Sequence, residues 1–112
     1  MELDPDDFNG GILRNKGTLA VLFVASWCPF CRSFFPVFQA AAEKAGIAWA
    51  LMDISDDDSP LWETFSIEVV PTIIVFKEGE AVSRRDGVLG RGLSERAVDE
   101  TIDQMKLLTT TT

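Results

Sequence analysis

The sequence contains no histidine and only two cysteines, Cys28 and Cys31. A tetrahedral zinc site needs four ligands, and this chain offers only two thiols for one. The lack of histidine also excludes Ser-His and Cys-His nucleophile systems. A stabilising disulfide scaffold is not expected, because a bridge across a two-residue gap closes too small a loop to restrain the unfolded chain. Thiol redox chemistry is what remains for this pair of cysteines.

Long apolar runs and basic residues are also scarce. The longest apolar run, residues 19–25, is much shorter than the about 20 residues that cross a bilayer. The first seven residues are acidic and lack the basic and apolar regions of a signal peptide, so we expect a cytoplasmic protein. The net charge of -8 argues against nucleic acid and membranes as partners, and we expect a monomer that meets other proteins.

The length and composition suit one soluble domain. At 112 residues the chain is long enough for one hydrophobic core and too short for two. Apolar residues make up 46% of it and charged residues 25%, which are ordinary values for a globular protein. We predict one domain over residues 1–108 and a frayed tail over residues 109–112.

Hydrophobic periodicity predicts two helices and two strands in the first half of the chain. In order they are a short helix over 4–16, a buried strand over 18–26, a helix over 29–45 and a second buried strand over 47–54. Phe8 and Ile12 share a helical face in the first segment, which Gly17 ends. Gly46 ends the second helix. The strand over 18–26 is apolar almost throughout, which is typical of a central strand that is buried on both faces.

The second half predicts a short helix, a hairpin and a closing helix. Their expected bounds are 59–65 with Ser59 as N-cap, strands 72–77 and 81–88 around a turn at 78–79, and a helix after the N-cap Ser94. Alternating strands and helices imply a parallel core, to which the hairpin adds antiparallel strands. We therefore predict an α/β protein, a three-layer α/β/α sandwich with a central mixed sheet.

The cysteines lie where a buried strand ends and a helix begins, which makes an otherwise moderately specific C-x-x-C pair informative. Cys28 should lie at the helix N-terminus, where free N–H groups and the helix dipole favour a thiolate. Cys31 is one turn further along the helix and should be more buried. These positions predict Cys28 as the attacking thiol and Cys31 as the resolving thiol.

Three segments resemble the thioredoxin family: residues 24–32 (VASWCPFCR), 69–72 (VVPT) and 76–80 (FKEGE). The resemblance covers nearly the whole chain and implies the thioredoxin fold. It also implies a cis peptide bond between Val70 and Pro71 that faces the dithiol, with the Val70 backbone pairing with an extended stretch of substrate. The substrate-docking surface would then consist of Trp27, Pro29, Phe30, Val70 and Pro71.

The chain also departs from the family pattern. Pro29 and Phe30 replace the usual Gly-Pro and are closer to the Pro-aromatic pair of glutaredoxins. Leu22 stands where thioredoxins bury an aspartate, and Leu51 stands where they carry the accompanying lysine. Without that internal base, deprotonation of Cys31 should depend on water or on a substrate group. The first family strand is reduced to residues 1–3.

These observations predict a thiol–disulfide oxidoreductase that exchanges the Cys28–Cys31 dithiol with protein substrates, as a reductase or as an isomerase or oxidase. We expect no bound cofactor, and electrons from a reductase or from small thiols. One alternative is a glutaredoxin-like enzyme that uses glutathione, although only Arg32 offers a cation near the site. Another is a binding or chaperone module with incidental redox activity.

The acidic segment 53–58 also raises the possibility of a calcium loop. It lacks the glycine and the distal glutamate of an EF-hand, so we interpret it as a solvated loop and predict no metal site.

Overall fold

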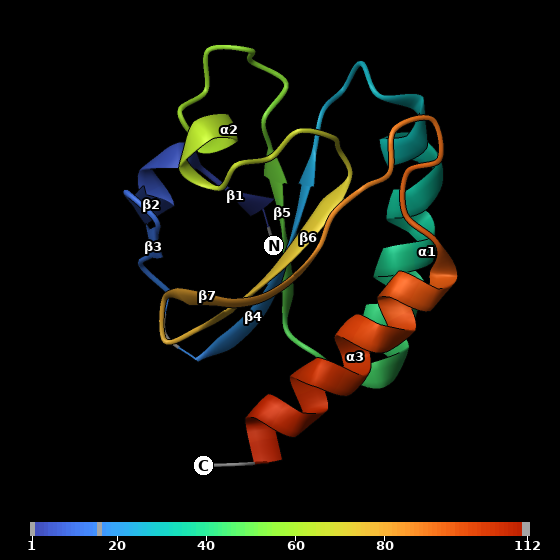
Figure 1. The fold of residues 1–112 in the computed structure, drawn as a ribbon. Helices are drawn as coiled ribbons and strands as arrows, with labels where there is room; N and C mark the ends of the chain where they lie inside the picture. The colour runs from blue at the N-terminus through green and yellow to red at the C-terminus, as the bar shows by residue number, and fades with distance from the viewer. Residues whose placement is uncertain (1, 16, 111–112) are drawn as a thin grey trace.

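The computed structural model describes residues 2–15 and 17–110, and it has a five-stranded mixed sheet at its centre (Figure 1). The strands lie in the order β1-β5-β4-β6-β7. Their bounds are Glu2–Leu3 for β1, Trp49–Asp53 for β5, Thr18–Val24 for β4, Thr72–Lys77 for β6 and Glu80–Arg85 for β7. β1 and β5 pair in parallel, as do β5 and β4, whereas β6 is antiparallel to both β4 and β7. The predicted mixed sheet is confirmed.

Helices cover both faces of this sheet (Figure 1). On one side lie α1 (Pro29–Ala45) and α3 (Glu95–Thr110), and on the other lies the short α2 (Leu61–Thr64). Alternate residues of β4 pack into two separate cores, Leu19, Val21 and Phe23 into one and Ala20 and Leu22 into the other. Because both faces of β4 are buried, its sequence is apolar almost throughout.

The helix predicted over residues 4–16 is wrong. The segment forms a single 3-10 turn, η1 (Pro5–Asp7), and a hairpin of β2 (Phe8–Asn9) and β3 (Ile12–Leu13). A capping box at Asp4 closes the turn, and Gly10 adopts φ +61° between the two strands. Two adjacent glycines disfavour a helix, at about 1 kcal/mol each. Phe8 and Leu13 are cross-strand partners that both face the core, so their spacing serves a hairpin.

The other elements lie close to their predicted positions. The bounds of α1 and β6 agree with prediction, β4 ends two residues earlier than predicted, and β5 lies inside its predicted range. β7 begins one residue earlier and ends three residues earlier than predicted. The predicted N-cap Ser59 is wrong, because α2 starts at Leu61 with Pro60 as its N-cap and no side-chain cap. Ser94 caps α3, since its Oγ accepts a hydrogen bond from Ala97 N–H at 3.4 Å. The predicted tail overlaps α3, which ends at Thr110, and residues 111–112 lie outside the described residues. No helix in the described part of the chain is long and apolar enough to cross a membrane.

Candidate active site

Cys28 is the N-cap residue of α1. Its backbone is extended (φ -98°, ψ 111°), and its Sγ accepts a hydrogen bond from Cys31 N–H at 3.3 Å. The same sulfur donates to the carbonyl oxygen of Val70 at 3.4 Å. Pro29 occupies the first helical position, where no N–H is needed. The sulfur therefore lies at the positive end of a 17-residue helix.

Cys31 is one turn further into α1 and is 3% exposed. Burial raises the pKa of the Cys31 thiol to about 12. The hydrogen bond to Cys28 and the negative charges of Cys28 and Asp53 act in the same direction, and a hydrogen bond with the Ala25 backbone opposes them. Cys31 is therefore a protonated thiol at neutral pH and must lose its proton before it can attack a disulfide.

The loop before β6 meets the dithiol. The Val70–Pro71 peptide bond is cis, as the resemblance implied. The side chains of Val70 and Pro71 are buried, so this loop presents its backbone to the site. Within the described residues, the N–H of Val70 has no hydrogen-bond partner, which leaves it free to pair with an extended peptide.

A groove runs past Cys28. It encloses about 220 Å³, and its lining, hereafter the docking groove, consists of Trp27, Cys28, Pro29, Phe30, Trp62, Glu68, Val69, Val70, Leu89 and Gly90. The side chains of Trp27 and Leu89 are 55% and 85% exposed, and Phe30 is 39% exposed. Exposed apolar side chains around a reactive group are typical of a contact surface for a partner.

Two stacked indole rings form one wall of this groove. The rings of Trp27 and Trp62 lie 6.2 Å apart and are inclined by only 10°. Both indole N–H groups donate to the loop after β5, Trp27 to the carbonyl of Ser55 and Trp62 to that of Ile54, each at 3.0 Å. Trp62 thus fixes one face of Trp27 and leaves its other face to the solvent.

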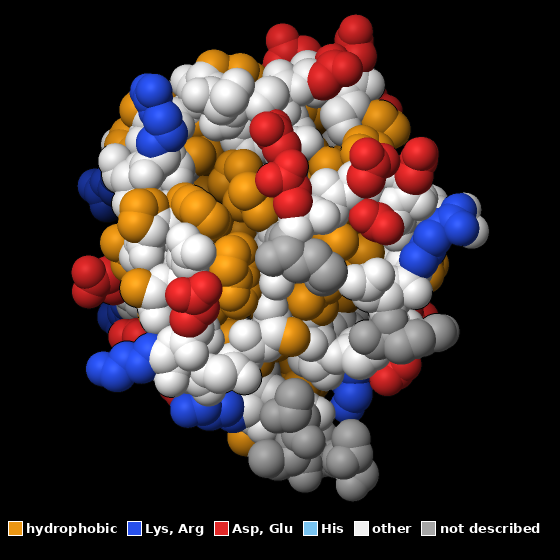
Figure 2. Space-filling view, turned by 180° about the vertical axis from the view of Figure 1, so that it is seen from behind, with side chains coloured by type: hydrophobic (Ala, Val, Ile, Leu, Met, Phe, Trp, Pro, Cys, Tyr) orange, Lys and Arg blue, Asp and Glu red, His pale blue; other side chains and the backbone are white. Residues whose placement is uncertain are grey.

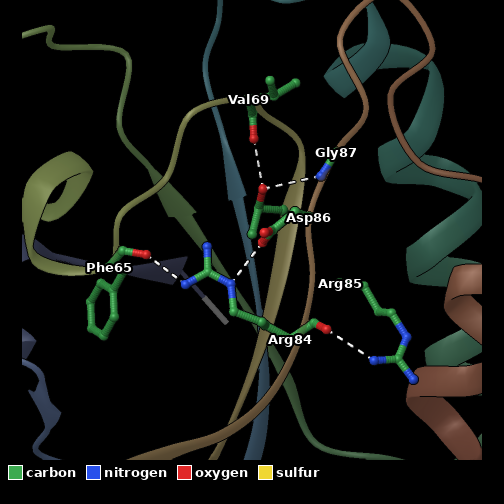
Figure 3. Close-up of polar contacts among 7 residues, drawn as sticks. Phe65, Val69, Arg84, Arg85, Asp86 and Gly87 are labelled. Carbon is green, nitrogen blue, oxygen red and sulfur yellow. Dashed lines mark hydrogen bonds and ion pairs between the residues drawn. The ribbon is translucent and has the colours of Figure 1, made fainter.

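Polar contacts join the loops on the far side of the groove (Figure 3). The buried hydroxyl of Thr72 donates to Val69 O at 2.6 Å and accepts from Gly87 N–H at 3.3 Å. Arg84 donates to Phe65 O at 2.6 Å and pairs with Asp86 at 2.7 Å, as Figure 3 shows. These contacts hold the loop that carries Val69 and Val70 against the loop that leads to Leu89.

Cys31 faces a different hollow. This rear pocket, of about 260 Å³, is lined by Val24, Ala25, Ser26, Cys31, Arg32, Phe35, Pro36, Leu51 and Asp53. Apolar side chains gather in a hollow beside α1 on the face of the molecule that Figure 2 shows. Leu22 and Leu51 are paired neighbours on β4 and β5, and Leu22 is fully buried. The aspartate and lysine expected of the family are thus replaced by an apolar contact.

The structure brings most of the predicted site residues together. Cys28, Trp27, Pro29, Phe30 and Val70 line the docking groove, whereas Pro71 is buried behind it. Sequence reasoning missed Trp62, Leu89 and Asp53. Trp62 and Leu89 belong to no motif. Asp53 lies in the acidic segment 53–58, whose lack of the EF-hand glycine and distal glutamate indicated a solvated loop.

The arrangement can carry out a two-step thiol–disulfide exchange. One sulfur lies in an apolar groove that an extended peptide can enter, and a second thiol is held behind it, one turn further along the same helix. The described residues contain no group of three or more His, Cys, Asp or Glu side chains that could hold a metal ion.

Comparison with known proteins agrees with this chemistry. A family model described as Thioredoxin matches residues 1–100. The chloroplastic thioredoxin X of Arabidopsis thaliana is 27% identical over 109 residues, which are 95% of this chain and 60% of that protein. The thioredoxin of Porphyra purpurea is 30% identical over 96 residues, covering 85% of this chain and 90% of that protein. A crystal structure of a reduced thioredoxin pre-protein from Schistosoma mansoni matches with a TM-score of 0.65 at 26% identity, over 80% of each chain.

Proposed function

Since the chain belongs to the thioredoxin family and is a thiol–disulfide oxidoreductase with the thioredoxin fold, we propose that it reduces disulfide bonds in extended segments of other proteins. The observation that carries this proposal is the position of Cys28 in the docking groove, beside exposed apolar side chains and the free N–H of Val70. An extended peptide can pair with that backbone while its disulfide meets the sulfur.

The proposed reaction has two steps. The Cys28 thiolate attacks one sulfur of the substrate disulfide, and the other substrate sulfur leaves and takes up a proton. Cys31 then loses its proton and attacks the Cys28 sulfur, which releases the second substrate thiol. The substrate gains two electrons, and the protein is left with a Cys28–Cys31 disulfide. A reductase or a small thiol would return the protein to its reduced form.

The redox potential of the dithiol tests the reducing direction. Strong oxidants of this chemistry gain their high potential from a stabilised reduced form, and the protonated Cys31 thiol does not supply that stabilisation at neutral pH. For a reductase we expect a potential near about -270 mV in titrations against dithiol buffers, with Trp27 fluorescence as the signal. A value of about -120 mV would instead indicate an oxidase.

Trapping tests the roles of the two cysteines. The Cys31→Ser variant should accumulate a mixed disulfide with a disulfide-bonded model protein, and the Cys28→Ser variant should form none. Trapping by Cys28→Ser would reverse the assigned roles. If neither variant nor the wild type reacts while partner binding persists, the chain is a binding module and the proposal is wrong.

The glutathione-dependent alternative is not proposed. Glutathione carries two carboxylates, which need cations beside the dithiol. The described lining of the docking groove includes the carboxylate of Glu68 and neither lysine nor arginine, and Arg32 lines the rear pocket instead.

A further inference from the structure

The two sulfurs open onto different hollows. Cys28 lines the docking groove and Cys31 lines the rear pocket, and neither cysteine lines both. A substrate joined to Cys28 covers the docking groove during the second step. The Cys31 proton must then leave through the rear pocket.

Loss of that proton is the difficult part of the second step. Burial is the largest cause of the raised pKa of Cys31, and it persists after Cys28 has joined a substrate. Leu22 and Leu51, which replace the aspartate and lysine of the family pattern, cannot accept a proton. A base that serves Cys31 must therefore come from elsewhere in the rear pocket.

Asp53 is the one carboxylate that lines the described part of this pocket. It is the last residue of β5, and its Oδ1 accepts hydrogen bonds from the backbone N–H of Ser55, at 2.8 Å, and from the Ser55 hydroxyl. The Ser55 Oγ in turn accepts from Ser26 N–H at 2.7 Å. These bonds tie the carboxylate to the segment before Cys28 through Oδ1, and Oδ2 has no partner among the described residues.

We propose that Asp53 accepts the proton of Cys31 through water in the rear pocket. As the Cys31–Cys28 sulfur bond forms, the S–H bond of Cys31 breaks, its proton passes through water to the Asp53 carboxylate and then to solvent, and the substrate thiolate leaves. A pocket of about 260 Å³ exceeds the about 30 Å³ that one water occupies in the liquid. The other charged side chain in its lining is Arg32. This inference rests on the proposed two-step exchange.

The test is a rapid-mixing measurement of each step with a disulfide-bonded model peptide. The rate of mixed-disulfide formation reports the attack by Cys28, and the rate of its resolution reports the attack by Cys31. The Asp53→Asn variant keeps an oxygen that accepts from Ser55, so the loop should be retained. We expect its resolution rate at neutral pH to fall on the order of tenfold, with mixed-disulfide formation unchanged. This is less than the about 100-fold at the low end for a general base, because the proton passes through water.

The direction of the change separates a proton acceptor from a simple charge. Asp53 raises the pKa of Cys31 by its negative charge, so a purely electrostatic role predicts faster resolution in Asp53→Asn. Unchanged or faster resolution would overturn the inference. The matched control is Asp56→Asn, which removes the same charge from an exposed neighbour outside the pocket and should leave both rates unchanged.

Two further variants protect the test. Asp53→Glu keeps a carboxylate at the pocket and should resolve within a fewfold of the wild-type rate. Ser55→Ala removes the hydroxyl contact but keeps the base, and a tenfold loss there with none in Asp53→Asn would show that only the loop matters. Failure of the first step in the wild type would refute the proposed function itself, independently of Asp53.

Discussion

Trp62 lies parallel to Trp27, at an inclination of 10° and a ring separation of 6.2 Å. Although Trp62 belongs to no motif, this stacking makes it part of the redox site. Stacked aromatic pairs contribute about 0.5–1.5 kcal/mol beyond the area that they bury. The pair also determines which face of Trp27 a substrate meets.

Replacing Trp62 should therefore weaken substrate binding. For Trp62→Leu we expect a KM for a protein disulfide several times higher, with kcat little changed, because Trp27 loses its support while the sulfurs stay in place. The control is Trp49→Leu, which alters a tryptophan packed against Phe35 and Phe38 away from the docking groove. It should lower the melting temperature without raising KM, and equal KM values for the two variants would contradict the role of the pair.

Thr72 should hold the shape of the groove through its hydroxyl. Thr72→Val keeps the volume but leaves Val69 O and Gly87 N–H without this partner, at a cost of about 1–3 kcal/mol in the free energy of unfolding. The expected result is lower stability together with a higher KM. Thr101→Val is the matched control, since Thr101 is also buried and donates only within α3. It should lose stability alone, as measured by denaturant unfolding and steady-state kinetics.

Gly87 should not tolerate a side chain. A Cβ at this position would collide with the carbonyl oxygen of Pro71. Gly87→Ala therefore forces the loop after β7 away from the loop before β6. Overpacking of this kind costs about 1–3 kcal/mol, and we expect a lower melting temperature and reduced activity. Gly11→Ala is the control, because nothing lies within 4 Å of its Cβ position. Equal melting temperatures for the two variants would show that the loops can separate freely.

Reduced protein should lose stability in alkaline solution. The pKa of Cys31 rises from 9.0 to about 12 on folding, so between these values the folded protein binds more protons than the unfolded chain. The free energy of unfolding therefore falls as pH rises above about 9, and the contribution of the buried thiol is fully present below it. Denaturant unfolding of reduced wild type and of Cys31→Ser across this range measures the effect. Parallel curves for the two proteins would contradict it.

Local patterns predicted the elements that position the dithiol. One clear rule of periodicity or capping predicts each of these elements, which are the strand over 18–24, the helix over 29–45 and the strand over 72–77. The N-terminal hairpin was missed because Phe8 and Ile12, four residues apart, match a helical face. In the structure Phe8 instead pairs with Leu13 across the strands and Ile12 is exposed, which only tertiary packing decides.

Local sequence predicted part of the site, and tertiary packing determined the rest. Cys28, Trp27 and Phe30 are adjacent in sequence, so their proximity needed no knowledge of the fold. Trp62 and Asp53 reach the site from α2 and β5, and their approach depends on strand order and on the path of the loop after β5. No local pattern carries that information.

Because β4 is buried on both faces, substitutions in either core should affect the dithiol. The strand contributes alternate side chains to two cores that are otherwise separate, and it leads directly to Cys28. A cavity opened in either core would remove packing contacts from β4. It would thereby shift the position of the Cys28 sulfur in the docking groove. Random substitutions deep in either core should therefore change the rate of disulfide exchange before they unfold the protein. That rate then reports on the packing of both cores.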